Sequence, residues 1–159
     1  LLFLDEPTSA VDPESRRDFW EKLFELADIG TTLLVSTHLM DQAERCHRLA
    51  ILDRGALLAD GTPGELTAEL EGRTFVVDTA DPRAAQRALV DVPGVLGVAQ
   101  VGNTLRVLIA EDAGDATQRM DKALATAGSK AEVAPAPPNL EDGFVAATRK
   151  GNGAKERAA

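Results

Sequence analysis

The sequence contains no tyrosine and only one cysteine among its 159 residues. A single cysteine excludes an intrachain disulfide and a thiolate metal cluster, and it favours a reducing, cytosolic setting. Aromatic residues make up only 4% of the chain, so we expect a core of leucine, valine, alanine and isoleucine. No apolar run approaches the roughly 20 residues that span a bilayer, and we find no signal peptide.

Positive charge is also scarce, with 17 basic residues against 26 acidic ones and a net charge of −9. Because the chain has no basic stripe, the sequence disfavours nucleic acid as a direct partner. A composition of 44% apolar and 27% charged residues is typical of a soluble globular protein rather than a disordered one. The length allows one domain or two small ones.

The first residues of the chain suggest a site at the end of a strand. Residues 1–4 are large and apolar, and Asp5, Glu6 and Pro7 follow at once. The apolar run predicts a strand buried on both faces, as in a parallel sheet, and Pro7 ends it because proline cannot donate to a sheet ladder. Asp5 and Glu6 then lie where open α/β sheets bind ligands. Taken alone, the same residues could equally form a polar turn.

A helix and a second strand follow this stretch. Asp12 and Pro13 predict a helix start, with a capping carboxylate and a proline in the first turn, and Gly30 predicts its end. Residues 31–36 are apolar and β-branched, so they predict a second buried strand. A strand, a helix and a further strand form a right-handed unit in which the two strands are parallel.

Parallel strands place both of their carboxyl ends at one edge of the sheet. His38 follows the second strand, so this topology brings it beside Asp5 and Glu6. A lone histidine is more often a surface or core residue, but one placed next to two carboxylates is a better candidate for a functional role. Cys46 and His47 have no partners at metal-binding spacing, and we interpret them as structural.

The next segment predicts small elements. Residues 40–46 predict a short helix, and residues 49–59 predict a hairpin that turns at Asp53-Arg54-Gly55. A small helix follows, from about Gly61 to Leu70. Glu71-Gly72 then marks a predicted domain boundary.

The remaining residues predict a second domain with the element order βαββαβ, which is the ferredoxin-like plan. Its expected strands are residues 74–79, 95–101, 104–110 and 131–134, with helices at 81–93 and 113–127. After a proline-rich linker, Asn139 caps a last helix from Leu140 to about Arg149. We therefore expect domains at 1–70 and 73–149 and a disordered tail at 150–159.

Three stretches of the first 70 residues resemble motifs of ATP-binding cassette (ABC) ATPases. The run LLFLDEPTSAVDP, residues 1–13, closely resembles the Walker B strand and D-loop. Residues 36–46 resemble the histidine switch loop with its following helix, and residues 53–63 resemble the hairpin that closes the cassette. Residues 138–145, PNLEDGFV, are similar to the tail of cassettes that serve drug-, antibiotic- or lipid-type exporters. This last match is shorter and less specific.

The resemblance implies an α/β fold, the C-terminal part of a P-loop NTPase cassette, and a role for each matching residue. Asp5 would hold Mg²⁺, Glu6 would be the general base that orients the attacking water, and His38 would contact the γ-phosphate of ATP. Ser9 and Asp12 would lie in the nucleotide-side loop that reaches a second cassette. These residue types suit phosphoryl transfer, which depends mostly on positioning and charge neutralisation.

By the same resemblance the protein would use ATP and Mg²⁺ and would act as a homodimer or heterodimer of cassettes. It would energise an integral membrane permease of an exporter from the cytoplasmic face of the cell membrane.

The departures from the family pattern matter as much as the matches. The 159 residues contain no G-x-x-x-x-G-K-[ST] loop to cradle phosphates, no glutamine loop and no Ser-Gly-Gly signature, all of which precede Walker B in the family. We therefore expect this chain to be the C-terminal part of a longer protein and to be inactive alone. Gln42 and His47 stand where the family usually has an acid, at positions that we expect to be peripheral. Gly143 replaces an aliphatic residue, at about 1 kcal/mol of helix stability.

Two alternatives remain at this point. One is a soluble cassette ATPase without a transport role, although such proteins usually carry two cassettes or long coiled insertions. The other is a non-catalytic binding or regulatory module that retains an ATPase remnant as a scaffold.

Overall fold

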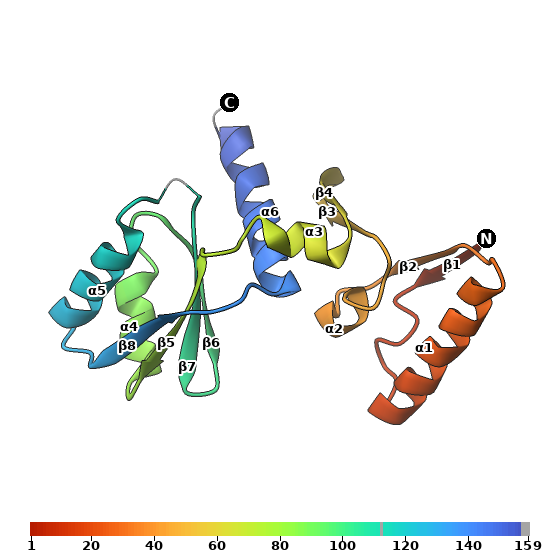
Figure 1. Ribbon diagram of the computed structural model, residues 1–159, viewed down its shortest axis with the longest axis horizontal. Helices are drawn as coiled ribbons and strands as arrows, with labels where there is room; N and C mark the ends of the chain where they lie inside the picture. Colours follow the sequence, from red (N-terminus) through yellow and green to blue (C-terminus); the bar gives the residue numbers. More distant parts are fainter. Residues whose placement is uncertain (112, 157–159) are drawn as a thin grey trace. The chain divides into compact units, whose positions relative to one another are not determined.

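The computed structural model describes residues 1–111 and 113–156 and has a mixed α/β architecture (Figure 1). It divides into two compact units, Leu1–Cys46 and the residues from His47 onward. The predicted domains at residues 1–70 and 73–149 stay predictions. Among the helices of the described residues, none combines the length and the apolar character that crossing a membrane requires.

The first unit contains the predicted strand, helix and strand, followed by one helical turn. These elements are β1 (Leu2–Asp5), α1 (Pro13–Asp28), β2 (Leu33–Ser36) and α2 (Met40–Ala43). The two strands pair in parallel, so the prediction of a parallel unit is confirmed, and Asp5 is the register partner of Ser36. The carboxyl ends of both strands consequently share one edge.

Helix α1 begins and ends as its sequence predicts. The Asp12 carboxylate accepts hydrogen bonds from the backbone N–H groups of Glu14 at 3.1 Å and Ser15 at 3.0 Å, which satisfies two donors at the helix start. Gly30 adopts a φ of +91° just beyond the helix, a conformation that glycine takes without a steric penalty. Trp20 and Leu23 form the buried stripe of the helix.

The expectation that the first strand is buried on both faces is wrong for the described residues. Phe3 remains 66% exposed and Leu34 remains 59% exposed, while the other apolar residues of β1 and β2 are only half-buried. The reason is that this sheet has only two strands in the part of the chain that the structure describes. An apolar strand sequence indicates that the strand can be buried, but it becomes buried only where neighbouring strands cover it.

The second unit opens with a hairpin and a short helix. These are β3 (Leu49–Asp53), β4 (Ala56–Gly61) and α3 (Pro63–Ala68). Arg54 and Gly55 turn the hairpin with φ values of +49° and +76°. A reciprocal cap starts α3, because Glu65 N–H donates to the Thr62 hydroxyl and Thr62 N–H donates to the Glu65 carboxylate.

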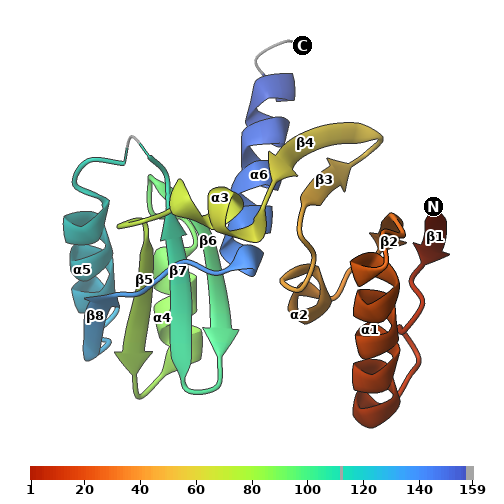
Figure 2. The same ribbon diagram turned by 45° about the vertical axis from the view of Figure 1, so that its right-hand side comes forward.

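A four-stranded antiparallel sheet forms the larger part of this unit. Its strands are β5 (Thr74–Thr79), β6 (Val95–Val101), β7 (Thr104–Ile109) and β8 (Ala131–Pro135), arranged in the order β6-β7-β5-β8. Helices α4 (Pro82–Leu89) and α5 (Ala116–Thr126) cover one face (Figure 2). Alternate residues of the strands, such as Val77, Leu105 and Val107, join these helices in the main core.

Helix α6 (Leu140–Glu156) packs against α3 and β6, on the other face of the sheet (Figures 1 and 2). It forms a second apolar cluster, the α6 cluster, which consists of Leu70, Leu96, Leu108, Val145 and Ala146. Because the hairpin and α3 also contact α6, they belong to the second unit rather than to the first.

The end of α6 differs from the prediction. The helix continues to Glu156, so residues 150–156 are helical where we expected a disordered tail, and residues 157–159 lie outside the described chain. Gly143 explains how α6 approaches α3 so closely, since a Cβ at this position would lie 3.3 Å from the Leu66 carbonyl oxygen. Glycine at this position therefore lowers the stability of the helix but allows α6 and α3 to pack closely.

Candidate functional site

The candidate site lies at the shared edge of β1 and β2. The Glu6 N–H group donates to both the backbone carbonyl and the hydroxyl oxygen of Ser36, each at 3.1 Å. The Ser36 hydroxyl in turn donates to the Asp5 carboxylate. Ser36 therefore holds the two acidic residues at the end of the neighbouring strand.

Glu6 and His38 meet across this edge, as the parallel topology predicts. The His38 Nδ1 atom lies 2.7 Å from the Glu6 Oε2 atom, and the two side chains are 67% and 37% exposed. Glu6 has a φ of +45°, which is uncommon for a residue with a side chain and occurs often at functional sites. This contact uses Oε2 of Glu6, and no hydrogen bond to Oε1 is found among the described residues.

The tautomer of His38 follows from the same contact. An ionised Glu6 can only accept, so the imidazole must donate from Nδ1. Neutral His38 then presents a lone pair at Nε2, whereas protonated His38 presents a second N–H there. Donation from Nε2 to an anionic ligand therefore requires the protonated ring as long as the contact with Glu6 persists.

The two residues of the following loop have different environments. Ser9 is exposed, and its N–H donates to the Glu6 carbonyl at 3.2 Å, so it belongs to the tight turn after β1. Asp12 points its carboxylate at the start of α1 rather than toward Glu6 and His38. Its hydrogen bond from the Ser15 N–H lowers the pKa of Asp12 below the ordinary value, because that donor stabilises the ionised form.

Asp5 is the residue with the chemistry to hold a magnesium ion. Among the described residues, no group of three histidine, cysteine, aspartate or glutamate side chains could hold a metal ion. Mg²⁺ does not need such a group, because it usually keeps several waters and binds through one or two carboxylates together with substrate phosphates. The exposed carboxylate of Asp5, beside the Ser36 hydroxyl, fits this ligand set.

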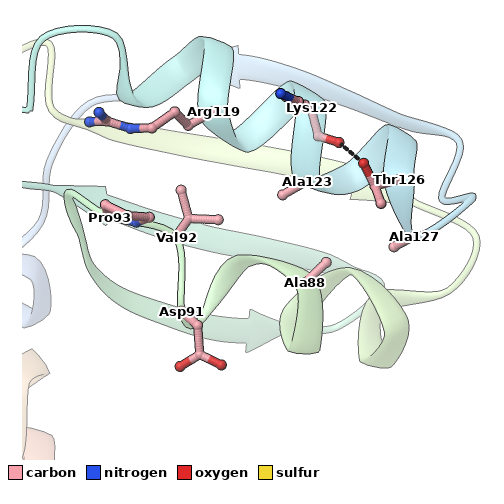
Figure 3. Close-up of a pocket in the computed structure, with 9 residues that line it drawn as sticks. All are labelled: Ala88, Asp91, Val92, Pro93, Arg119, Lys122, Ala123, Thr126 and Ala127. Carbon is pink, nitrogen blue, oxygen red and sulfur yellow. Dashed lines mark hydrogen bonds between the residues drawn. The ribbon is translucent and has the colours of Figure 1, made fainter.

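The second unit contains a separate hollow of about 570 Å³ between α4 and α5 (Figure 3). Its walls are mostly apolar and include Val92, Pro93 and Ala123. Arg119 is already engaged, because it donates to the Ala113 carbonyl at 2.7 Å and pairs with Asp115 at 2.7 Å. Asp91, Lys122 and Thr126 also line the hollow, and it contains none of the residues of the candidate site.

Comparison with known proteins relates the chain to ATP-binding proteins. It is 35% identical over 150 residues to the Nod factor export ATP-binding protein I of Rhizobium leguminosarum bv. viciae, which covers 93% of this chain and 46% of the relative. It is 35% identical over 164 residues to the daunorubicin resistance ATP-binding protein DrrA3 of Streptomyces coeruleorubidus, with 99% and 51% coverage. A probable multidrug ABC transporter ATP-binding protein, YbhF of Escherichia coli, is 51% identical over 69 residues, which cover 43% of this chain and 12% of the relative.

The homologues of this chain are ABC transporter ATP-binding proteins, and their matches cover most of it. Its homologues are of the drug and antibiotic exporter type. No family model matches the chain. The chain spans about half or less of the length of these curated relatives.

Gln42 is a residue whose environment the sequence analysis predicted wrongly. We expected it to be peripheral, yet it is only 1% exposed. Its Oε1 atom accepts a hydrogen bond from the Thr37 hydroxyl at 3.2 Å, directly beside His38. No clear signal in the sequence pointed to this burial, because Gln42 stands among the charged residues Asp41, Glu44 and Arg45. His47, the second departure, is exposed, as a peripheral position should be.

Cys46 has a structural environment, in agreement with its interpretation from the sequence. The thiol is half-buried, lies 3.8 Å from the Gln42 carbonyl oxygen and has no disulfide partner. Burial raises the pKa of Cys46 above the ordinary value for a thiol, because the thiolate is poorly solvated there. The thiol is therefore less reactive than an exposed one.

Proposed function

We propose that this chain is the C-terminal part of the ATP-hydrolysing subunit of an ABC exporter. The observation that carries the proposal is the contact between Glu6 and His38, placed beside Asp5 at the shared end of two parallel strands. The relatives support the transport role, since their names describe export or drug resistance.

In this proposal each residue has one task. Glu6 would accept, through Oε1, a proton from the water whose oxygen bonds to the γ-phosphorus of ATP. The bond from that phosphorus to the bridging oxygen breaks, and ADP leaves with its electron pair. Protonated His38 would donate from Nε2 to the γ-phosphate. Asp5 would hold Mg²⁺, which would neutralise phosphate charge. Ser9 and Asp12 belong to the loop that faces a second cassette.

The finer architecture follows from the same family. The parallel pair of β1 and β2 would be part of the sheet of a P-loop NTPase, and the hairpin of β3 and β4 resembles the hairpin found near the end of such cassettes. The strand order β6-β7-β5-β8 supports a ferredoxin-like accessory domain. The subunit would work as a dimer of cassettes bound to an integral membrane permease, at the cytoplasmic face of the membrane. The 159 residues alone would neither bind ATP well nor hydrolyse it, because they contain no phosphate-binding loop.

The test measures phosphate release by the protein as its gene encodes it, by its Glu6→Gln variant and by the 159-residue chain. We expect Glu6→Gln to bind ATP but to lower turnover by about 100-fold or more, the range that a general base contributes. Glu21→Gln is the matched control, since Glu21 is an exposed acid on α1 of the same unit. Undiminished turnover in Glu6→Gln, or turnover by the 159-residue chain alone, would contradict the assignment. Binding of a partner protein without any ATP hydrolysis would favour the regulatory module instead.

A further inference from the structure

We propose that Thr37 and Gln42 are positioning residues that fix His38 against Glu6. This inference rests on the proposed function, and it adds two residues that no motif assigned. The starting point is that His38 is 67% exposed, so packing around its ring does little to fix its position. Its orientation must come from the loop that carries it, residues 36–39.

The Thr37 hydroxyl makes two hydrogen bonds that close this loop. It accepts from the Leu39 N–H group at 3.1 Å and donates to Gln42 Oε1 at 3.2 Å. A hydroxyl that bonds the backbone two residues further on forms a local turn. This turn encloses His38, because Thr37 precedes it and Leu39 follows it.

Gln42 anchors the same turn from a buried position. Its side chain accepts from Thr37, while its backbone N–H donates to the Leu39 carbonyl at 3.1 Å. Gln42 therefore bonds to both neighbours of His38, one through its side chain and one through its backbone. At 1% exposure it is among the most deeply buried side chains of the first unit, so it gives the loop a fixed support.

The opposite end of the Gln42 amide indicates which atom matters. Its Nε2 group is buried and has no hydrogen-bond partner among the described residues. A buried donor without a partner is costly. The Oε1 acceptor is therefore the atom through which the amide of Gln42 holds Thr37.

The loop is also tied to Glu6 itself. Ser36, two residues before His38, accepts from the Glu6 N–H group through its carbonyl and its hydroxyl. Ser36 thus ties the backbone before His38 to Glu6. Thr37 and Leu39, the two neighbours of His38, are held by each other and by Gln42. Loss of the Thr37 hydroxyl would remove its hydrogen bonds to Leu39 and Gln42, and the imidazole of His38 could then move away from Glu6.

The first test compares Thr37→Val with Thr37→Ser in the full 159-residue chain by ¹⁵N NMR of the imidazole rings. Valine has nearly the shape of threonine without the hydroxyl, and serine keeps the hydroxyl. The chain has only two histidines, so His47 is an internal control. We expect Thr37→Val to shift the His38 ring signals and speed amide exchange at Leu39, while Thr37→Ser and His47 stay close to wild type. Unchanged His38 signals in Thr37→Val would overturn the inference.

The second test measures ATP turnover by the protein as its gene encodes it. Thr37→Val should lower kcat by about tenfold or more with little change in KM, since a misplacement of about 1 Å in a catalytic group can cost about 100-fold. Thr37→Ser should retain most of the wild-type kcat. Gln42→Met removes the acceptor of the Thr37 hydroxyl with a side chain of similar length, so it should lower kcat in the same way. It provides the test if Thr37→Val does not fold. An inactive wild-type protein would contradict the proposed function, whereas an active wild type with a fully active Thr37→Val variant would contradict only the positioning role.

Discussion

The ion pair between Arg106 on β7 and Asp142 in the first turn of α6 gives the sharpest stability prediction. Arg106 Nε lies 3.1 and 3.0 Å from the two carboxylate oxygens of Asp142, and Nη2 lies 2.6 Å from Oδ2. The same carboxylate accepts from the Asn139 N–H at 2.9 Å. The side chains of Arg106 and Asp142 are only 19% and 7% exposed, so water screens this pair poorly.

Asp142→Ala should therefore destabilise the second unit strongly. The substitution leaves the Arg106 guanidinium largely buried with one protein acceptor, the Pro137 carbonyl at 2.5 Å. Removing one partner of a buried ion pair costs about 3–5 kcal/mol of unfolding free energy. Urea unfolding of the 159-residue chain, followed by far-UV circular dichroism and by hydrogen exchange of residues 139–149, measures this loss. Asp142→Asn should lose less, because the amide keeps the shape and one acceptor.

The pair between Arg48 and Asp60 is a matched control in the same unit. It is also bidentate, with both N–O distances at 2.8 Å, but its side chains are 65% and 43% exposed. Exposed pairs contribute little, so Asp60→Ala should change stability only slightly. The double variant Arg106→Leu/Asp142→Leu should recover much of the loss, since apolar residues can replace a buried pair. Equal losses in Asp142→Ala and Asp60→Ala would refute the argument that burial determines the effect.

Three further predictions concern other parts of the chain. Gly97→Ala should destabilise the second unit by about 1–3 kcal/mol in chemical denaturation, because its Cβ would lie 3.0 Å from Val145 Cγ1; an unchanged midpoint would contradict this close approach. The pKa of Asp12 is lowered in the folded chain, so its cap on α1 is fully present above the unfolded value of 3.8 and is lost as the pH falls through the folded value. Amide exchange in the first turn of α1 should therefore accelerate in acid, and Asp12→Asn should remove this pH dependence. Cys46, whose pKa is raised by burial, should react with iodoacetamide at pH 8 more slowly than a free cysteine does, and equal rates would show an accessible thiol.

Much of the candidate site could be predicted from the sequence because parallel strands impose it. Once β1 and β2 are parallel, the residues that follow them must meet at one edge, which is how His38 could be placed near Glu6. The start of α1 was equally local, since Asp12 and Pro13 carry the capping information themselves. The catalytic roles of these residues stay predictions.

The features that sequence reasoning missed depend on contacts between distant residues. The exposure of Phe3 depends on which strands are present beside β1, and no property of the strand itself reports that. The burial of Gln42 depends on how a four-residue helix folds back on its loop. The close contact of Gly143 with Leu66 joins segments more than 70 residues apart. From the sequence alone, Gly143 therefore predicted only a loss of helix stability.

The α6 cluster has a consequence for how such a chain could be shortened or rearranged. Leu70 belongs to the segment after the hairpin, Leu108 to the sheet and Ala146 to the last helix, and all three are buried together. Ending or joining the chain at residues 71–72 would therefore remove the sheet and α6, and it would also expose Leu70, which these elements bury. Exchanging the accessory domain between relatives would require moving α6 together with residues 47–70. The segment that must be exchanged as one piece is therefore larger than the sheet.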